Sequence, residues 1–250
     1  VARAAISADG KTACVIEVNS ETDFVAKNDM FQEYVADAAL VALMHNGEVC
    51  DMKTFQCPKV HKSFEERLTD LIAKIGENMN LRRAAMLEVS NGVIASYVHN
   101  ACKPNLGKIG VLVALESNGD KAKLQELGKH IAMHVAASNP QFLTIADVDQ
   151  ASIDHEKAIF SEQAKASGKP ENIIEKMVEG RIKKYFDEVV LEEQAYIMDP
   201  DKKVKQIVAD AAKEMGADIK LKAFVCFRLG EGLEKRNEDF AAEVASQLKK

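Results

Sequence analysis

Cysteines, long apolar runs and dense basic runs are all scarce in this 250-residue sequence. Its five cysteines are dispersed and odd in number, with no C-x-x-C spacing, a pattern typical of reduced thiols that indicates neither disulfides nor a zinc site. The longest apolar stretches, such as residues 109–115, are too short to span a bilayer, and the sequence from Val1 onward lacks the basic-then-apolar pattern of a signal peptide. We therefore expect a soluble cytoplasmic protein that contacts no membrane.

Motifs for nucleotide or acyl chemistry are also absent. The formal net charge of -6 provides no overall attraction to phosphate backbones, so we expect no direct nucleic-acid binding. No P-loop, Gly-rich dinucleotide fingerprint or G-x-S-x-G nucleophile elbow occurs, so direct nucleotide binding and acyl transfer have no local support. These absences favour an interaction protein without a cofactor over an enzyme.

The most enzyme-like feature is a pair of histidines, His130 and His134, which lie four residues apart and therefore on one face of a helix. Such a pair can hold a metal ion. Ile131 stands where a zinc hydrolase needs its glutamate base, and the spacing reveals no third ligand. A metal-dependent enzyme using His130 and His134 is thus the alternative function, while polar or half-buried structural histidines are the simpler interpretation.

The N-terminal part of the chain alternates strand and helix patterns. Short apolar runs flank Asp9-Gly10 and Asn91-Gly92, dipeptides that tolerate positive φ and favour tight hairpins. Apolar residues recur at helical spacing over residues 30–44 and 64–75, and the second helix should end near Gly76. We expect two antiparallel hairpins with two amphipathic helices packed on them.

The C-terminal part starts with a strand over residues 111–115 and a helix from Leu124, an order that faintly repeats the first part. Helical patterns over residues 149–166 and 170–186, joined by a turn containing Gly168, predict a helical hairpin. Its seam has few large apolar residues, so the hairpin should project and pack lightly.

These patterns predict an α+β fold with two related subdomains, each a small antiparallel sheet packed with helices. A protruding helical hairpin and a C-terminal helix complete it, and the helix has Phe240, Val244 and Leu248 at a spacing of four. The expected divisions are 1–104 for the N-terminal core subdomain, 105–229 for the C-terminal core subdomain with the hairpin at about 149–186, and 230–250 for the C-terminal helical module.

An aromatic side chain, Phe24, lies on the polar connection between a predicted strand and the helix over residues 30–44. Asp29 followed by Gln32 looks like a helix N-cap with its capping-box partner, which leaves Phe24 outside both elements. The ring either folds back as a hydrophobic staple or anchors the chain in a partner's pocket.

Residues 17–27, Glu-Val-Asn-Ser-Glu-Thr-Asp-Phe-Val-Ala-Lys, resemble the signature of the elongation factor Ts family. Further blocks that resemble this family follow in its order, at residues 74–83, 130–138, 176–181 and 239–244. Because several separate blocks agree, the resemblance covers nearly the whole chain and favours an exposed Phe24.

The resemblance implies a translation elongation factor that is not an enzyme but a guanine-nucleotide exchange factor. It implies binding to elongation factor Tu, in the GDP-bound and nucleotide-free forms, and GDP release through insertion of Asp23 and Phe24 near the partner's magnesium and phosphate site. The partner-binding residues that it implies are Thr22, Asp23, Phe24, Val25, Ile75, Gly76, His99, Phe240 and Val244. The resemblance also implies that the chain itself holds no metal and that some members of the family could form a homodimer.

Members of the family usually begin with a small helical domain that resembles ubiquitin-associated domains, followed by a linker. This sequence starts at Val1, immediately before the first expected hairpin, and resembles only the core and the C-terminal module. The resemblance implies that absence of the small domain weakens affinity for the partner.

Overall fold

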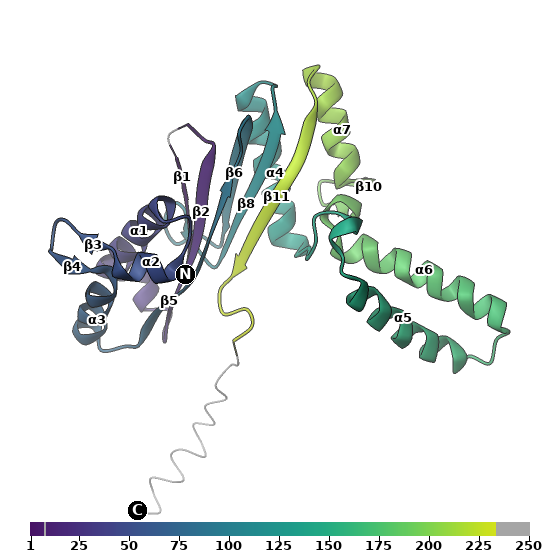
Figure 1. Cartoon of the computed structure of the whole chain (residues 1–250), viewed down its shortest axis with the longest axis horizontal. Helices are drawn as coiled ribbons and strands as arrows, with labels where there is room; N and C mark the ends of the chain where they lie inside the picture. The colour runs from purple at the N-terminus through teal and green to yellow at the C-terminus, as the bar shows by residue number, and fades with distance from the viewer. Residues whose placement is uncertain (8, 234–250) are drawn as a thin grey trace, which may run out of the picture.

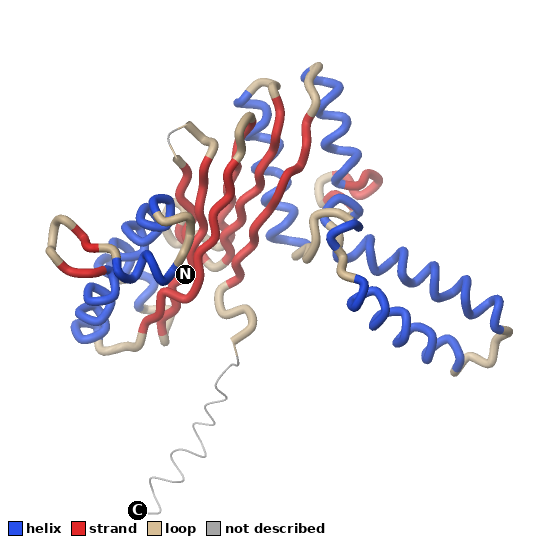
Figure 2. Tube along the Cα trace, in the orientation of Figure 1, coloured by secondary structure: helices blue, strands red, loops and turns tan. Residues whose placement is uncertain are grey.

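The computed structural model describes residues 1–7 and 9–233 and arranges them in four layers, helix, sheet, sheet and helix (Figures 1 and 2). Helices cover the outer face of each sheet, and the inner faces of the sheets pack on each other through apolar side chains that include Ala4, Ile94 and Leu112. The expected α+β class is confirmed. The predicted C-terminal helix with Phe240, Val244 and Leu248 lies outside the described residues.

The first sheet is antiparallel throughout. In spatial order its strands are β5 (Met79–Glu88), β2 (Thr12–Ser20), β1 (Ala2–Ile6) and β7 (Leu106–Gly107). The hairpin predicted at Asp9-Gly10 is confirmed: β1 pairs with β2, Gly10 has φ of 70°, and the Asp9 carboxylate accepts a hydrogen bond from the Lys11 amide. The strand register places Ala2 opposite Glu17.

Helices cover the outer face of this sheet. They are α1 (Asp29–Met44), α2 (Val49–Thr54) and α3 (Phe64–Ile75), with a short ribbon of β3 (Gln56–Cys57) and β4 (Lys62–Ser63) before α3. The predictions of α1 and α3 are confirmed, including the end of α3 at Gly76, which adopts the left-handed conformation with φ of 82°. Such a backbone is easiest for glycine because other residues clash through their Cβ atom.

The prediction of Asp29 as the N-cap of α1 is wrong. Asn28 is the cap, because its side chain accepts a hydrogen bond from the Phe31 amide while its own backbone is extended. Asp29 is the first helical residue, where its negative charge interacts favourably with the positive end of the helix dipole. Gln32 does not return to the cap either, since its amide donates to the Ala26 carbonyl.

The second sheet has the order β11 (Ile219–Arg228), β8 (Ile109–Ser117) and β6 (Gly92–His99). Helices α4 (Lys121–Ser138) and α7 (Val204–Met215) pack on its outer face. Gly128 lets α4 approach β6 closely, because a Cβ atom there would lie 2.6 Å from the Cβ atom of Ala95. The predicted strand at residues 111–115 and the predicted helix from Leu124 are confirmed.

The hairpin predicted at Asn91-Gly92 is wrong. Strand β5 before it pairs with β2 in the first sheet, whereas β6 after it pairs with β8 in the second sheet. The alternating pattern of β6 specifies a strand with one buried face but does not specify which strand pairs with it. The division at residue 104 stays a prediction, and β6 contributes to the second sheet from before that position.

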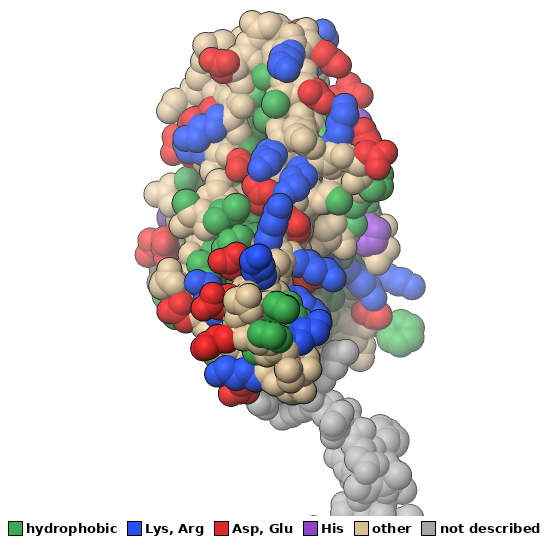
Figure 3. All heavy atoms as spheres, turned by 90° about the vertical axis from the view of Figure 1, so that its right-hand side faces the viewer, with side chains coloured by type: hydrophobic (Ala, Val, Ile, Leu, Met, Phe, Trp, Pro, Cys, Tyr) green, Lys and Arg blue, Asp and Glu red, His purple; other side chains and the backbone are tan. Residues whose placement is uncertain are grey.

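A helical hairpin projects from the base of the second layer of helices (Figure 1). It consists of α5 (Gln150–Lys165) and α6 (Glu171–Val189), in which only Ala164 and Ile182 are buried. Seen from the hairpin side, basic and acidic side chains are interspersed on the surface (Figure 3). A small ribbon of β9 (Ala195–Tyr196) and β10 (Asp199–Lys203) leads back to α7. In the part of the chain that the structure describes, no helix is long and apolar enough to cross a bilayer.

Candidate partner-binding site

Residues 21–28 connect β2 to α1 and are called the Phe24 loop below. The side chain of Phe24 is 82% exposed, so it is not a staple over the core. The neighbouring side chain, Val25, is only 3% exposed and packs in the core between α1 and the first sheet. Val25 was expected to face a partner, but in this conformation its buried side chain anchors the loop, while Phe24 and Asp23 remain available at the surface.

The C-terminal half of the Phe24 loop is fixed by the helix that follows it. Residues Val25–Lys27 form a short 3-10 turn, and the Asn28 amide donates to the Val25 carbonyl at 2.9 Å. The buried side chain of Gln32, on α1, donates to the Ala26 carbonyl at 2.7 Å. These contacts hold the backbone just after Phe24.

The N-terminal half of the loop is joined to the connection between α3 and β5. The Thr22 amide donates to one carboxylate oxygen of Glu77 at 3.0 Å, and the Thr22 hydroxyl donates to the other at 2.7 Å. Glu77 directly follows Gly76, so the structure brings the end of α3, with half-buried Ile75 and exposed Gly76, beside Thr22. Sequence positions far apart in the chain therefore lie at one end of the first sheet.

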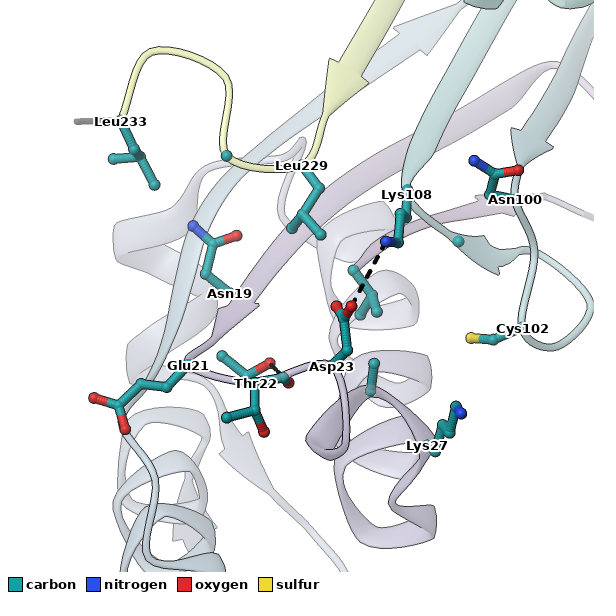
Figure 4. A pocket seen from close by; sticks show the side chains of 15 residues that line it. Asn19, Glu21, Thr22, Asp23, Lys27, Asn100, Cys102, Lys108, Leu229 and Leu233 are labelled. Carbon is teal, nitrogen blue, oxygen red and sulfur yellow. Dashed lines mark hydrogen bonds and ion pairs between the residues drawn. The ribbon is translucent and has the colours of Figure 1, made fainter. Parts of the chain in front are cut away.

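His99 is brought to the same end of the molecule by the second sheet. It lies exposed at the end of β6, where its carbonyl accepts a hydrogen bond from the Lys108 amide at 3.1 Å. The Lys108 ammonium in turn lies 3.7 Å from the Asp23 carboxylate (Figure 4). The Tyr97 hydroxyl and the His99 Nδ1 atom are 3.0 Å apart, which orients the imidazole.

A cavity of about 450 Å³ opens between the Phe24 loop, the chain after β6 and the chain after β11 (Figure 4). Both polar and apolar side chains line its walls. Residues that line it include Asn19, Asp23, Lys27, Cys102, Lys108 and Leu229. Sequence reasoning missed Lys108, Cys102 and Leu229, because only the pairing of β7 with β1 and the course of β11 bring them beside the loop.

A fully buried carboxylate, Glu17, supports β2 just before the Phe24 loop. It accepts hydrogen bonds from the guanidinium groups of Arg82 and Arg83 on β5 and from the Gly230 amide at 2.8 Å. Burial acts to raise the pKa of Glu17, but the hydrogen bonds from Gly230 and Arg83 outweigh it, so that the pKa lies below its ordinary value. This cluster ties the first sheet to the chain that leaves β11.

The predicted histidine pair does not form a metal site in the described residues. His134 is fully buried, its Nδ1 atom accepts the Ile197 amide proton at 3.2 Å, and its Nε2 atom faces the Gln194 carbonyl oxygen at 2.8 Å. Burial lowers the pKa of His134, although the Gln194 hydrogen bond opposes this shift. With both ring nitrogens engaged, His134 has no lone pair left for a metal, and no group of three metal-binding side chains occurs within residues 1–7 and 9–233.

The predicted site residues in the described part of the chain thus converge on one end of the molecule. Thr22, Asp23 and Phe24 are exposed, and Gly76 and His99 lie exposed nearby, whereas Val25 is buried. Phe240 and Val244 lie outside the described residues. Glu77 falls within residues 74–83, one of the blocks that resemble the family, but nothing in the sequence indicated its contact with Thr22.

A family model described as elongation factor TS matches residues 21–231. The chain is 55% identical to the elongation factor Ts of Paramagnetospirillum magneticum over 97% of its own length and 78% of that relative. It is 54% identical to the Rhodospirillum rubrum protein of the same name, over 98% of this chain and 80% of the relative, and 55% identical to that of Caulobacter vibrioides, over 95% and 76%. The chain belongs to the elongation factor Ts family.

Proposed function

We propose that this chain is a guanine-nucleotide exchange factor that binds elongation factor Tu and promotes the release of its GDP. The observation that carries the proposal is the 82% exposure of Phe24 on a loop held by hydrogen bonds on both sides. An aromatic ring held out from a fixed backbone gains burial only in the pocket of another molecule. Membership of the elongation factor Ts family supports elongation factor Tu as that molecule.

The energy available from Phe24 also indicates how much of the interface must contribute. Burying the ring provides about 2 kcal/mol. A ten-thousandfold acceleration of GDP loss corresponds to about 5.5 kcal/mol of barrier, so Phe24 needs support from other contacts. Ile75, Gly76 and His99 lie at the same end of the molecule and are proposed to provide them, together with the tail residues Phe240 and Val244.

Asp23 is proposed to act on the magnesium side of the partner's nucleotide site. Its carboxylate is 82% exposed, and its contact with Lys108 is a long ion pair between exposed groups, which costs little to break. A carboxylate placed near a bound cation competes with the phosphate oxygens for it. By linkage, GDP must weaken binding of this chain by the same factor by which the chain weakens binding of GDP.

The GDP-bound and nucleotide-free forms of elongation factor Tu are therefore the proposed partners. In this proposal the chain acts without chemical catalysis and without a cofactor, because the nucleotide and its magnesium bind to the partner and not to this chain. A cytoplasmic site of action follows from the proposed partner, as translation takes place there. The homodimer expected for some family members stays a prediction for this chain.

The test is release of labelled GDP from purified elongation factor Tu, with the Phe24→Ala variant compared with the unmodified chain. We expect Phe24→Ala to lower the maximal release rate about thirtyfold, which is the burial energy of the ring expressed as a rate. Leu40→Ala is the matched control, because Leu40 is an exposed apolar side chain of α1, 58% exposed and outside the site. No acceleration by the unmodified chain, or equal rates for Phe24→Ala and Leu40→Ala, would contradict the proposal.

A further inference from the structure

The two halves of the Phe24 loop are held in different ways. The half after Phe24 is fixed by its own helix through buried Val25, the Asn28 cap and the Gln32 side chain. The half before Phe24, residues 21–23, has exposed side chains and no buried anchor. Its direction therefore depends on contacts made with other parts of the chain.

Glu77 makes the closest of these contacts. Its two carboxylate oxygens accept separate hydrogen bonds from the Thr22 amide and the Thr22 hydroxyl, at 3.0 and 2.7 Å, across a sequence separation of 55 residues. A two-point contact to backbone and side chain of one residue fixes both its position and its orientation. The other contact from a distant segment, Lys108 with Asp23, is a 3.7 Å ion pair between side chains that are 57% and 82% exposed, and it holds the backbone poorly.

We propose that Glu77 is a positioning residue for nucleotide exchange: it holds Thr22, and through Thr22 it sets the direction in which Phe24 and Asp23 are presented. The inference rests on the proposed exchange function for its effect on the partner, but its effect on the loop is a property of the free chain. In this proposal Glu77 acts through the loop, whose Thr22 it holds with both carboxylate oxygens, and not by direct contact with the partner. In this proposal Thr22 is the residue of the loop that Glu77 holds.

Loss of the contact between Glu77 and Thr22 should weaken binding to the partner more than it changes the rate of GDP release from the bound complex. A loop that is no longer held in place must be ordered when the partner binds, and this cost appears as weaker binding. Once bound, the same Phe24 and Asp23 side chains reach the same groups. Glu77→Ala should thus raise the half-saturating concentration of the chain about fivefold to tenfold, with a maximal exchange rate close to that of the unmodified chain.

The first experiment measures the loop in the free chain. The sequence has no tryptophan, so Phe24→Trp introduces a single tryptophan, which can be excited selectively, at the tip of the loop. Time-resolved fluorescence anisotropy of Trp at this position should show greater local motion when Glu77→Ala is added, and a smaller increase with Thr22→Val, which keeps the amide hydrogen bond. Asp70→Ala is the control, because Asp70 is an exposed α3 carboxylate paired with Lys62 and not with the loop. Unchanged local motion in Glu77→Ala would overturn the proposal.

The second experiment is a double-mutant cycle of the half-saturating concentration in the GDP-release assay, with Phe24 intact. Thr22→Val removes the hydroxyl hydrogen bond, and Glu77→Ala removes both this bond and the amide hydrogen bond, so the double variant should be no weaker than Glu77→Ala alone. Additive effects would show that Thr22 and Glu77 act independently of each other on binding and would overturn the proposal. If the unmodified chain does not accelerate GDP release from elongation factor Tu, the proposed exchange function is wrong. The fluorescence anisotropy of the free chain then still decides whether Glu77 holds the loop.

Discussion

The two sheets of this protein each pass from a central strand to a covering helix, but they make the connection differently. After β8, which ends at Ser117, residues 118–120 suffice: Asp120 caps α4 by accepting from the Lys123 amide at 2.9 Å. After β2, which ends at Ser20, the chain takes the longer course of residues 21–28 and exposes Phe24 before Asn28 caps α1.

The difference shows that the length of the Phe24 loop is not needed to connect strand and helix. In the short connection the hydrogen bonds stay local, as in the Gly119 amide that donates to the Ser117 hydroxyl at 3.0 Å. In the long one they reach Glu77, on a separate part of the chain. A longer loop that is nevertheless held in place, with an apolar ring at its tip, is typical of a surface that binds another protein.

The largest expected effect on stability lies at the base of the loop. Glu17→Ala should lower the free energy of unfolding by about 3 kcal/mol, because Arg82 and Arg83 would lose the buried carboxylate that they share. Denaturant unfolding followed by circular dichroism measures this. A loss below about 0.5 kcal/mol, as for ordinary surface substitutions, would contradict the view that β2 is fixed firmly before the loop begins.

Within the loop, neighbouring side chains should give opposite results. Val25→Ala should cost about 1.5 kcal/mol of stability, because it leaves a cavity against α1. Phe24→Ala should leave the unfolding midpoint unchanged while it lowers exchange. Comparing the two variants in the same unfolding series tests whether Val25 stabilises the fold while Phe24 does not. A stability loss for Phe24→Ala that matches Val25→Ala would mean that the ring supports the core.

A pH effect is expected in α4, the helix after the short connection. Because burial lowers the pKa of His134 from the ordinary value of 6.5, the unfolded chain takes up a proton more readily than the folded chain. The contribution of His134 is thus complete above pH 6.5 and decreases as the pH falls below that value. Unfolding free energies between pH 7.5 and 5.5 should depend less on pH in His134→Asn, and an identical dependence would contradict the buried, neutral imidazole.

The smallest effect on stability is expected for the helical hairpin. Replacing residues 149–186 with a short linker should keep a single cooperative unfolding transition and change the free energy of unfolding by less than about 1 kcal/mol, because α5 and α6 have few buried side chains and contact mainly each other. The contacts of Gln141 and Leu191 that close the base of the hairpin remain. Loss of cooperative unfolding would show that the hairpin belongs to the core.

The sequence predicted local features well and long-range pairing poorly. Helices α1 and α3 follow from apolar spacing, and the end of α3 follows from the glycine stop at Gly76; these signals are local. The choice between Asn28 and Asp29 as a cap could not be made from residue type, because both side chains accept hydrogen bonds. The partner of β6 depends on how the two sheets stack, which alternation along one strand does not encode.

The candidate site shows the same limit. Phe24 was found because an aromatic residue on a polar connection is unusual, and its exposure is confirmed. Val25, its neighbour, was expected at the surface but is buried, because residue type and position give no direction for a side chain in a 3-10 turn. Glu77 and Lys108 lie beside the loop only through the packing of α3 and the pairing of β7, so no local pattern could have assigned them.

The most direct test replaces residues 21–28 with the short connection of the other sheet, Asn-Gly-Asp, and measures both unfolding and GDP release from elongation factor Tu. We expect the shortened chain to unfold in one cooperative transition, destabilised by about 2 kcal/mol through loss of Val25, and to release no GDP above the spontaneous rate. A shortened chain that still accelerates GDP release, or one that no longer folds, would contradict the claim that this loop acts on a partner and is not required for the fold.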